Sequence, residues 1–112
     1  MRYYISQAMN GRTDAEIKEE RHKVSAAMKK ENPEAKVIDS FFEGAPNEAK
    51  PLWFLGKSFE LLSTADMCVF VDYAADTARG CALEYRACLA YGIDCCKFDT
   101  EMGAFVATTR GG

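Results

Sequence analysis

The feature that most constrains the fold is an unbroken apolar run, Met67-Cys68-Val69-Phe70-Val71. A strand with no polar side is typical of a sheet that is covered on both faces. Shorter β-prone runs occur at residues 2–6, 35–40 and 93–98, and residues 99–112 contain the apolar stretch 104–107. We expect the first four runs to be neighbouring parallel strands with residues 67–71 at the centre. The last segment is expected to form a C-terminal arm or a short fifth strand.

Apolar residues between these runs recur at helical spacing. Thr13-Asp14-Ala15-Glu16 matches a capping box, which predicts a helix over residues 14–30. Pro51 is suited to the first position of a second helix. A third helix is expected from about residue 80 to residue 91, followed by a glycine that ends it. The stretches 41–50 and 72–79 have no helical or strand period and are expected to be loops.

The resulting order, β-α-β-α-β-α-β, favours a parallel sheet with helices on both faces. The chain has 112 residues, which is room for one domain. We therefore predict a single α/β domain of the flavodoxin-like (Rossmann-like) type with four to five strands. Ligands bind such sheets at the carboxyl ends of the strands, where the strand order reverses. The segments at 6–12, 40–50 and 72–80 should border any site.

Composition excludes several classes of function. The chain has 14 Lys and Arg against 17 Asp and Glu, so it lacks the clustered positive charge that polymeric nucleic acid requires. No apolar stretch approaches the roughly 20 residues that cross a bilayer. The first β-prone run begins at Arg2, which leaves no room for a signal peptide. We expect a cytoplasmic protein without a membrane partner.

The five cysteines all lie in the second half of the chain and form no C-x-x-C pair. Their odd number and spacing favour reduced thiols over disulfides, zinc or redox chemistry. His22 is the only histidine, and it lies in a mixed charge run from Glu16 to Lys23 that is typical of a solvated helix face. We expect no metal and no cofactor.

Two features could carry chemistry. The loop from Ser6 to Gly11 leads into the capped helix, where free backbone amides suit a phosphate or another anion, although a plain connection explains it equally well. Glu84 falls in the second turn of the third helix. A carboxylate there points toward the ligand crevice, and the alternative is a solvated Glu84 paired with Arg86 or Lys97.

A group of short motifs resembles the nucleoside 2-deoxyribosyltransferase superfamily, which includes the deoxynucleoside-monophosphate N-glycosidases. The resemblance covers roughly residues 2–96 and is closest to small bacterial and phage domains of that type. It implies a protein that binds a nucleoside or nucleotide and breaks or exchanges its N-glycosidic bond. The motifs are Tyr3-Tyr4-Ile5-Ser6, the loop ending Asn10-Gly11, Ala65-Asp66 and Gly80-x-x-x-Glu84.

The resemblance also implies roles for individual residues. Glu84 matches the nucleophile that attacks the anomeric carbon, and a carboxylate suits an oxocarbenium-like transition state. Tyr3 matches a tyrosine whose hydroxyl orients that carboxylate; the alternative is a half-buried strand aromatic. Gly80 matches a glycine at which the backbone passes close to the ligand. The loop that wraps the sugar and the 5′-phosphate corresponds to Ser6, Gln7, Met9, Asn10 and Gly11.

Two positions depart from the family pattern. Ser58 stands where an acidic residue commonly handles the departing base, and Ala78 stands where many members have another acidic residue. Asp72 and Asp76 lie in the adjacent loop and are candidates to replace them. Without a general acid, base release slows by roughly two to four orders of magnitude. The alternatives are a non-catalytic nucleotide-binding module that uses the same pocket, and a protein with a vestigial pocket.

Self-association is also expected. Members of the resembled superfamily complete their pockets across a subunit interface, and exposed aromatic clusters commonly mark such interfaces. We expect a homodimer or a higher even oligomer. The aromatic residues in this region are Phe41, Phe42, Trp53 and Phe54.

Overall fold

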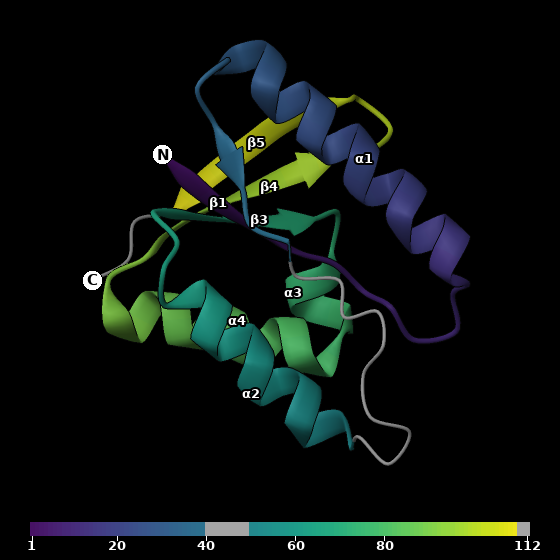
Figure 1. Cartoon of the computed structure of the whole chain (residues 1–112), viewed down its shortest axis with the longest axis vertical. Helices are drawn as coiled ribbons and strands as arrows, with labels where there is room; N and C mark the ends of the chain where they lie inside the picture. The colour runs from purple at the N-terminus through teal and green to yellow at the C-terminus, as the bar shows by residue number, and fades with distance from the viewer. Residues whose placement is uncertain (40–49, 110–112) are drawn as a thin grey trace.

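A computed structural model describes residues 1–39 and 50–109 of the chain. This part is an α/β structure with one five-stranded sheet in the order β2-β1-β3-β4-β5 (Figure 1). The first four strands are parallel with β3 in the centre, which confirms the prediction for residues 67–71. The strands are β1 (Arg2–Ser6), β2 (Lys36–Val37), β3 (Met67–Val71), β4 (Asp94–Asp99) and β5 (Ala104–Thr109).

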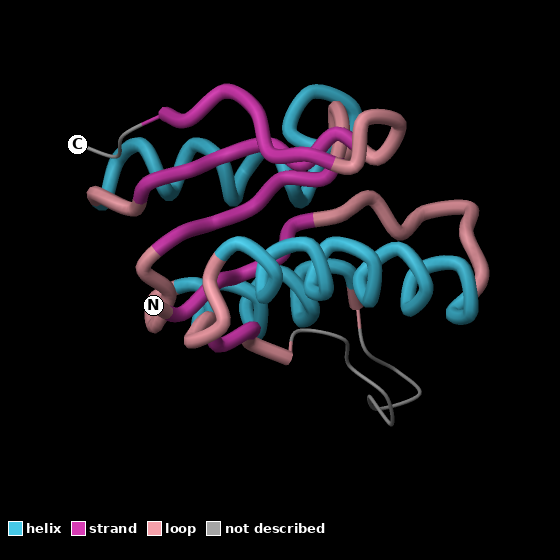
Figure 2. The backbone as a smooth tube through the Cα atoms, turned by 90° about the horizontal axis from the view of Figure 1, so that it is seen from above, coloured by secondary structure: helices cyan, strands magenta, loops and turns pink. Residues whose placement is uncertain are grey.

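The C-terminal segment forms a strand, β5, which is antiparallel to β4 at one edge of the sheet (Figure 2). At the opposite edge, β2 is shorter than the predicted run 35–40. It pairs with β1 at Lys36 and Val37, and just beyond this pairing the Ile38 amide donates to the Tyr3 carbonyl at 2.9 Å. Ser40, the last residue of the predicted run, and most of the predicted loop 41–50 lie outside the described residues.

The helices are α1 (Asp14–Glu31), α2 (Pro51–Leu62), α3 (Ala74–Thr77) and α4 (Arg79–Tyr91). The capping box is confirmed: the Glu16 amide donates to Thr13 Oγ1 at 3.2 Å, and the Thr13 amide donates to the Glu16 carboxylate at 3.0 Å. The short helix α3 lies in the stretch predicted as a loop. That prediction was wrong because Ala74 is buried in the core, and this burial fixes a single turn that has no sequence period.

Successive side chains of the strands pack into two separate clusters, as the alternation along a strand requires. Ile5, Val69 and Phe98 pack with Val24 and Met28 of α1. Tyr4, Cys68, Phe70 and Cys95 pack with buried residues of α2 and α4 (Figure 1). None of the described helices is long and apolar enough to cross a bilayer.

The strand order places a reversal between β1 and β3. From β1 the chain passes through α1 to β2 on one side, and from β3 it passes through α4 to β4 on the other. The carboxyl ends of β1 and β3, at Ser6 and Val71, therefore border the point where doubly wound sheets bind ligands.

Candidate active site

Polar side chains are buried at the carboxyl end of β1. Among the described residues, the buried polar side chains are Ser6, Gln7 and Glu84, exposed by 1%, 4% and 5%. Burying polar groups in a small core costs free energy unless they are paired. Ser6 and Glu84 meet on one face of the sheet at this end, which marks this place as the candidate site.

Glu84 projects from α4 toward β1. It shares the buried face of α4 with Cys81 and Cys88, and the Ser6 hydroxyl donates to Glu84 Oε1 at 3.1 Å. The alternative of a solvated glutamate is wrong because the side chain is almost fully buried. Lys97, one of its possible partners, instead stacks its ammonium group 3.8 Å from the centre of the Tyr73 ring.

The surroundings of Glu84 disfavour its ionised form and leave one of its carboxylate oxygens without a hydrogen-bond partner. Burial raises the pKa of Glu84, while the hydroxyls of Tyr4 and Ser6 and the positive charge of Arg21 lower it. The second oxygen, Oε2, is buried and has no hydrogen-bond partner within the described part of the chain. Buried carboxylate oxygens are nearly always hydrogen-bonded, so Oε2 is an unsatisfied atom that is enclosed by the surrounding side chains.

The tyrosine that interacts with Glu84 is Tyr4 and not Tyr3. Side chains alternate along β1, so Tyr4 and Ser6 point toward α4, whereas Tyr3 lies on the opposite face with its hydroxyl 3.4 Å from the Met1 sulfur. Burial, followed by the proximity of Glu84, raises the pKa of Tyr4 far above its ordinary value, which keeps the hydroxyl protonated. The assignment of Tyr3 was wrong by one residue, which is enough to change the face of a strand.

Ser58 of α2 completes the polar contacts of Tyr4. Its hydroxyl interacts with the Tyr4 hydroxyl and lowers the pKa of Tyr4. Ser58, a position at which the chain departs from the pattern of the resembled family, thus lies beside Tyr4 and offers a hydroxyl there in place of a carboxyl group.

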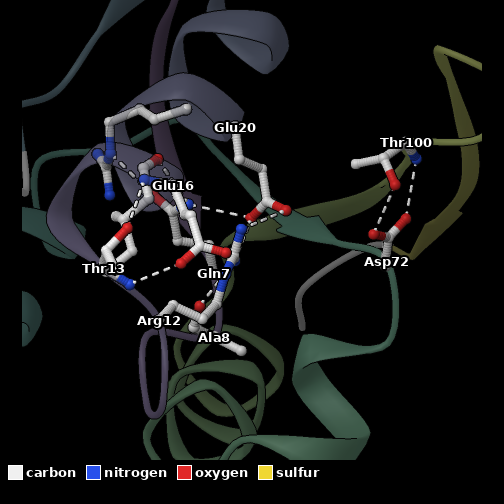
Figure 3. A network of polar contacts seen from close by, with 10 residues as sticks. Gln7, Ala8, Arg12, Thr13, Glu16, Glu20, Asp72 and Thr100 are labelled. Carbon is white, nitrogen blue, oxygen red and sulfur yellow. Dashed lines mark hydrogen bonds and ion pairs between the residues drawn. The ribbon is translucent and has the colours of Figure 1, made fainter.

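Gln7 is buried on the opposite side of β1 and anchors α1. Its amide nitrogen donates to the Ile17 carbonyl at 3.2 Å and to Glu20 at 3.1 Å, and its Oε1 accepts from Arg21 at 2.9 Å (Figure 3). Arg12 holds the same Glu20 with two hydrogen bonds of 2.8 and 3.1 Å. This network fixes the loop after β1 against α1.

The rest of that loop lies away from Glu84, Ser6 and Tyr4. Met9, Asn10 and Gly11 are exposed, and Gly11 takes a left-handed φ of 76° in the turn before α1. Gly80 also shows no close approach, because a Cβ placed there would meet only the Leu55 Cδ1 atom, at 3.9 Å.

Asp72 has a structural task at the end of β3. Its two carboxylate oxygens accept from the Thr100 amide and the Thr100 hydroxyl, each at 2.8 Å, which ties β3 to the turn after β4 (Figure 3). Asp72 also has a left-handed φ of 52°, a conformation that asparagine and aspartate tolerate better than other residues with a side chain. Its carboxylate is therefore already engaged, and Asp76 is exposed.

Arg21 was not singled out from the sequence. It lies within the charge run that was interpreted as a solvated face, yet its position is four residues after Ile17 and three before Val24, on the buried stripe of α1. Burial lowers the pKa of Arg21, and the side chains of Tyr4 and Glu84 act in the opposite direction. The helical spacing of the run could have identified it.

Two hollows lie near these residues. A hollow of about 420 Å³ between α1 and the end of β2 is within the size range of ligand pockets, and Arg21 lines it. Its other lining residues are Lys18, His22, Ser25, Lys29, Val37, Ile38 and Asp39. A smaller hollow of about 280 Å³ lies at the ends of β1 and β3 and is lined by the Arg12–Glu20 pair and Asp72. Neither hollow is lined by Tyr4, Ser6 or Glu84, and Arg21, which lines the larger one, is linked to Glu84 through its charge.

The described residues contain no group of three or more His, Cys, Asp or Glu side chains that could hold a metal ion. No protein-family model, curated protein or solved structure matches this chain.

Proposed function

We propose that this protein binds a nucleoside or nucleotide at the carboxyl end of β1 and breaks or exchanges its N-glycosidic bond, with Glu84 as the nucleophile. The observation that carries the proposal is the Glu84 carboxyl group: Oε1 is held by Ser6, while Oε2 is buried without a hydrogen-bond partner among the described residues. A fixed carboxylate with one unsatisfied oxygen is suited to attack on an anomeric carbon once the side chains that enclose it move to admit the sugar.

The proposed reaction has two steps. Oε2 forms a bond to the anomeric carbon as the carbon–nitrogen bond breaks, and the base leaves with the electron pair of that bond. Water or the nitrogen of a second base then attacks the same carbon, and the bond from that carbon to Oε2 breaks with its electron pair returning to the carboxylate. The attacking group loses its proton to solvent, the departed base takes one from solvent, and the product is the free sugar or a new nucleoside. Ser6 and Tyr4 keep the carboxylate in place during both steps.

The charges that line the hollow beside α1 favour an anionic ligand such as a nucleotide. Lys18, Arg21 and Lys29 line it against a single carboxylate, Asp39. We also propose that the chain is a single flavodoxin-like domain with helices on both faces, since the order 2-1-3-4-5 is that of such sheets, with β5 reversed. The cysteines are free thiols, which supports a cytoplasmic location.

A non-catalytic nucleotide-binding module is the second candidate. The observation that favours it is the lack of an acid beside Tyr4: Ser58 has no carboxyl group, and Asp72 is bonded to Thr100. Such a module would hold the same ligand in the same pocket and release no base.

Base release separates the two candidates. Purified protein is incubated with deoxynucleosides and deoxynucleoside monophosphates, and free base is measured by chromatography while binding is measured by calorimetry. If Glu84 is the nucleophile, Glu84→Gln should lower base release by several orders of magnitude and leave binding within about tenfold. The matched control is Glu19→Gln, an exposed glutamate of α1.

The possible results have distinct meanings. Base release that is equal in the wild type and in Glu84→Gln would refute the nucleophile. Saturable binding without base release would establish the binding module instead. Neither binding nor release with any compound of the panel would refute both.

A further inference from the structure

The hollow beside α1 is lined by one flank of that helix. The side chains that α1 contributes to it follow the first of them by three, four, seven and eleven positions, so they lie within an arc of about 100° around the helix axis. These residues are Lys18, Arg21, His22, Ser25 and Lys29. At 1.5 Å per residue they extend over about 16 Å of the helix. The hollow therefore runs along α1 for about three turns, with the end of β2 on its other side.

The charges of α1 are sorted around its axis. Lys18, Arg21 and Lys29 line the hollow, whereas no acidic residue of the helix does. Asp14 lies one turn before Lys18, and at 100° per residue the other acidic residues lie about 100° or more from Lys18 around the axis. Those residues are Glu16, Glu19, Glu20 and Glu31. The charge run that reads as mixed along the sequence is thus positive on the side that faces β2.

The net charge of the hollow is opposite to that of the chain. Asp39, which follows β2, is the only carboxylate among the lining residues. Three positive charges against one negative charge leave +2 when His22 is neutral, whereas the whole chain carries −3. A concave site whose charge differs in sign from its surroundings concentrates ions of the opposite sign. The hollow therefore favours anions although the protein as a whole repels them.

Arg21 gives the hollow a charge that is already held in position. Its Nε donates to Gln7 Oε1 at 2.9 Å, and Gln7 is buried at the end of β1. Lys18 and Lys29 are exposed at the two ends of the hollow. A guanidinium ordered in advance loses little conformational freedom when an anion binds, and the lysines can adjust to the ligand.

We propose that the hollow beside α1 is a second binding site, which takes a chain of linked phosphates such as tripolyphosphate or the triphosphate of a nucleotide. A single phosphate group reaches both Lys18 and Lys29 only if the two side chains stretch toward each other along the helix, which costs conformational entropy. Successive phosphates of a chain meet the cations in turn. Ser25 and His22 lie between the two lysines and offer an O–H and an N–H donor to the same oxygens.

This site is separate from the Glu84 carboxyl group. Tyr4, Ser6 and Glu84 do not line the hollow, and Glu84 lies on α4, which is a different helix from the one that lines it. The proposal therefore goes beyond the proposed cleavage of a glycosidic bond and does not depend on it. A phosphate chain without a sugar is the probe that examines this site alone.

The experiment is a calorimetric titration of the full chain with tripolyphosphate at low ionic strength, where exposed charges are least screened. The wild type should show saturable binding. The double variant Lys18→Gln, Lys29→Gln should bind about tenfold more weakly, with about threefold from each lysine. Both lysines are exposed, so the fold should be preserved.

The matched control is the double variant Lys23→Gln, Lys30→Gln. It removes the same charge from two exposed positions of the same helix, about 140° and 120° around the axis from Lys18. Its affinity for tripolyphosphate should stay within about twofold of the wild type. A difference between the two double variants therefore reports the hollow and not the net charge of the protein.

Titrations with other compounds define the ligand. Inorganic monophosphate should bind about tenfold or more weakly than tripolyphosphate. A deoxynucleoside triphosphate that binds no more tightly than tripolyphosphate would identify the phosphate chain as the whole ligand. One that binds more tightly, and is weakened equally by Lys18→Gln, Lys29→Gln, would identify a nucleotide as the source of the chain.

The results decide the proposal whether or not Glu84 is a nucleophile, because tripolyphosphate has no glycosidic bond. Glu84→Gln should not weaken the binding of tripolyphosphate, and a clear loss in that variant would show that the two sites are not separate. A wild type that does not bind tripolyphosphate would refute the proposal. Equal losses in the two double variants, or monophosphate binding as tight as that of tripolyphosphate, would refute it as well.

Discussion

Replacing Glu84 with Gln should change how the stability of the protein depends on pH. Burial raises the pKa of Glu84 in the folded state above its ordinary value of 4.5. Below pH 4.5 the carboxyl group is protonated in both the folded and the unfolded chain. As the pH rises toward the folded-state pKa, only the unfolded chain releases the proton, so the free energy of unfolding falls. The wild type therefore loses stability relative to Glu84→Gln on going from acid to neutral pH.

The size of the effect follows from the linkage between protons and folding. A rise of one in the pKa corresponds to about 1.4 kcal/mol of lost stability at neutral pH. For a chain of 112 residues, about 1.4 kcal/mol shifts the melting temperature by about 6 °C. The amide nitrogen that replaces Oε2 lacks an acceptor among the described residues, which costs about 1–3 kcal/mol. That cost is the same at every pH and does not alter the slope.

The assay is urea or thermal unfolding of the two proteins at intervals between pH 4 and pH 8, with Glu19→Gln as the exposed control. The difference between the wild type and Glu84→Gln should grow with pH and then level off, while the control should follow the wild type. A difference that stays flat, or that favours the wild type as pH rises, would show that the pKa of Glu84 is not raised.

Three further predictions concern the same site. If Glu84 must be ionised to react, the acid limb of the pH profile of kcat/KM should lie above pH 4.5. Ser6→Ala should move this limb to higher pH, because the Ser6 hydroxyl lowers the pKa of Glu84. A limb that moves to lower pH would contradict this. Tyr4→Phe should reduce base release or ligand binding by about tenfold or more, whereas Tyr3→Phe, on the other face of β1, should leave both within about twofold. Asp72→Ala should lower the free energy of unfolding by about 2–4 kcal/mol through its two bonds to the threonine after β4, and Asp72→Asn by less; denaturation that is unchanged in Asp72→Ala would refute this role.

The candidate site shows where sequence patterns are informative and where they are not. Spacing placed Glu84 on one helix face with Cys81 and Cys88 and left open whether that face is buried, and the motif comparison assigned Ser6 and Ser58 to the ligand site. Sequence patterns could not settle which of two adjacent tyrosines faces Glu84, because that choice depends on the register of β1 between its neighbours. The sequence also left open the role of Asp72, whose partner Thr100 lies 28 residues away.

The sequence by itself determined the helices α1 and α4, the central strand β3 and the parallel order of the first four strands. Those signals are local: a capping box, a glycine that ends a helix, and an apolar run of strand length. The single turn of α3, the antiparallel pairing of β5 and the burial of Arg21 depended on tertiary structure. Ala74 of α3 and Arg21 of α1 interact with segments that are distant in the sequence, and only the folded chain brings those segments together. The strand β5 pairs with the neighbouring β4 across a short turn, with Asp99 opposite Ala104.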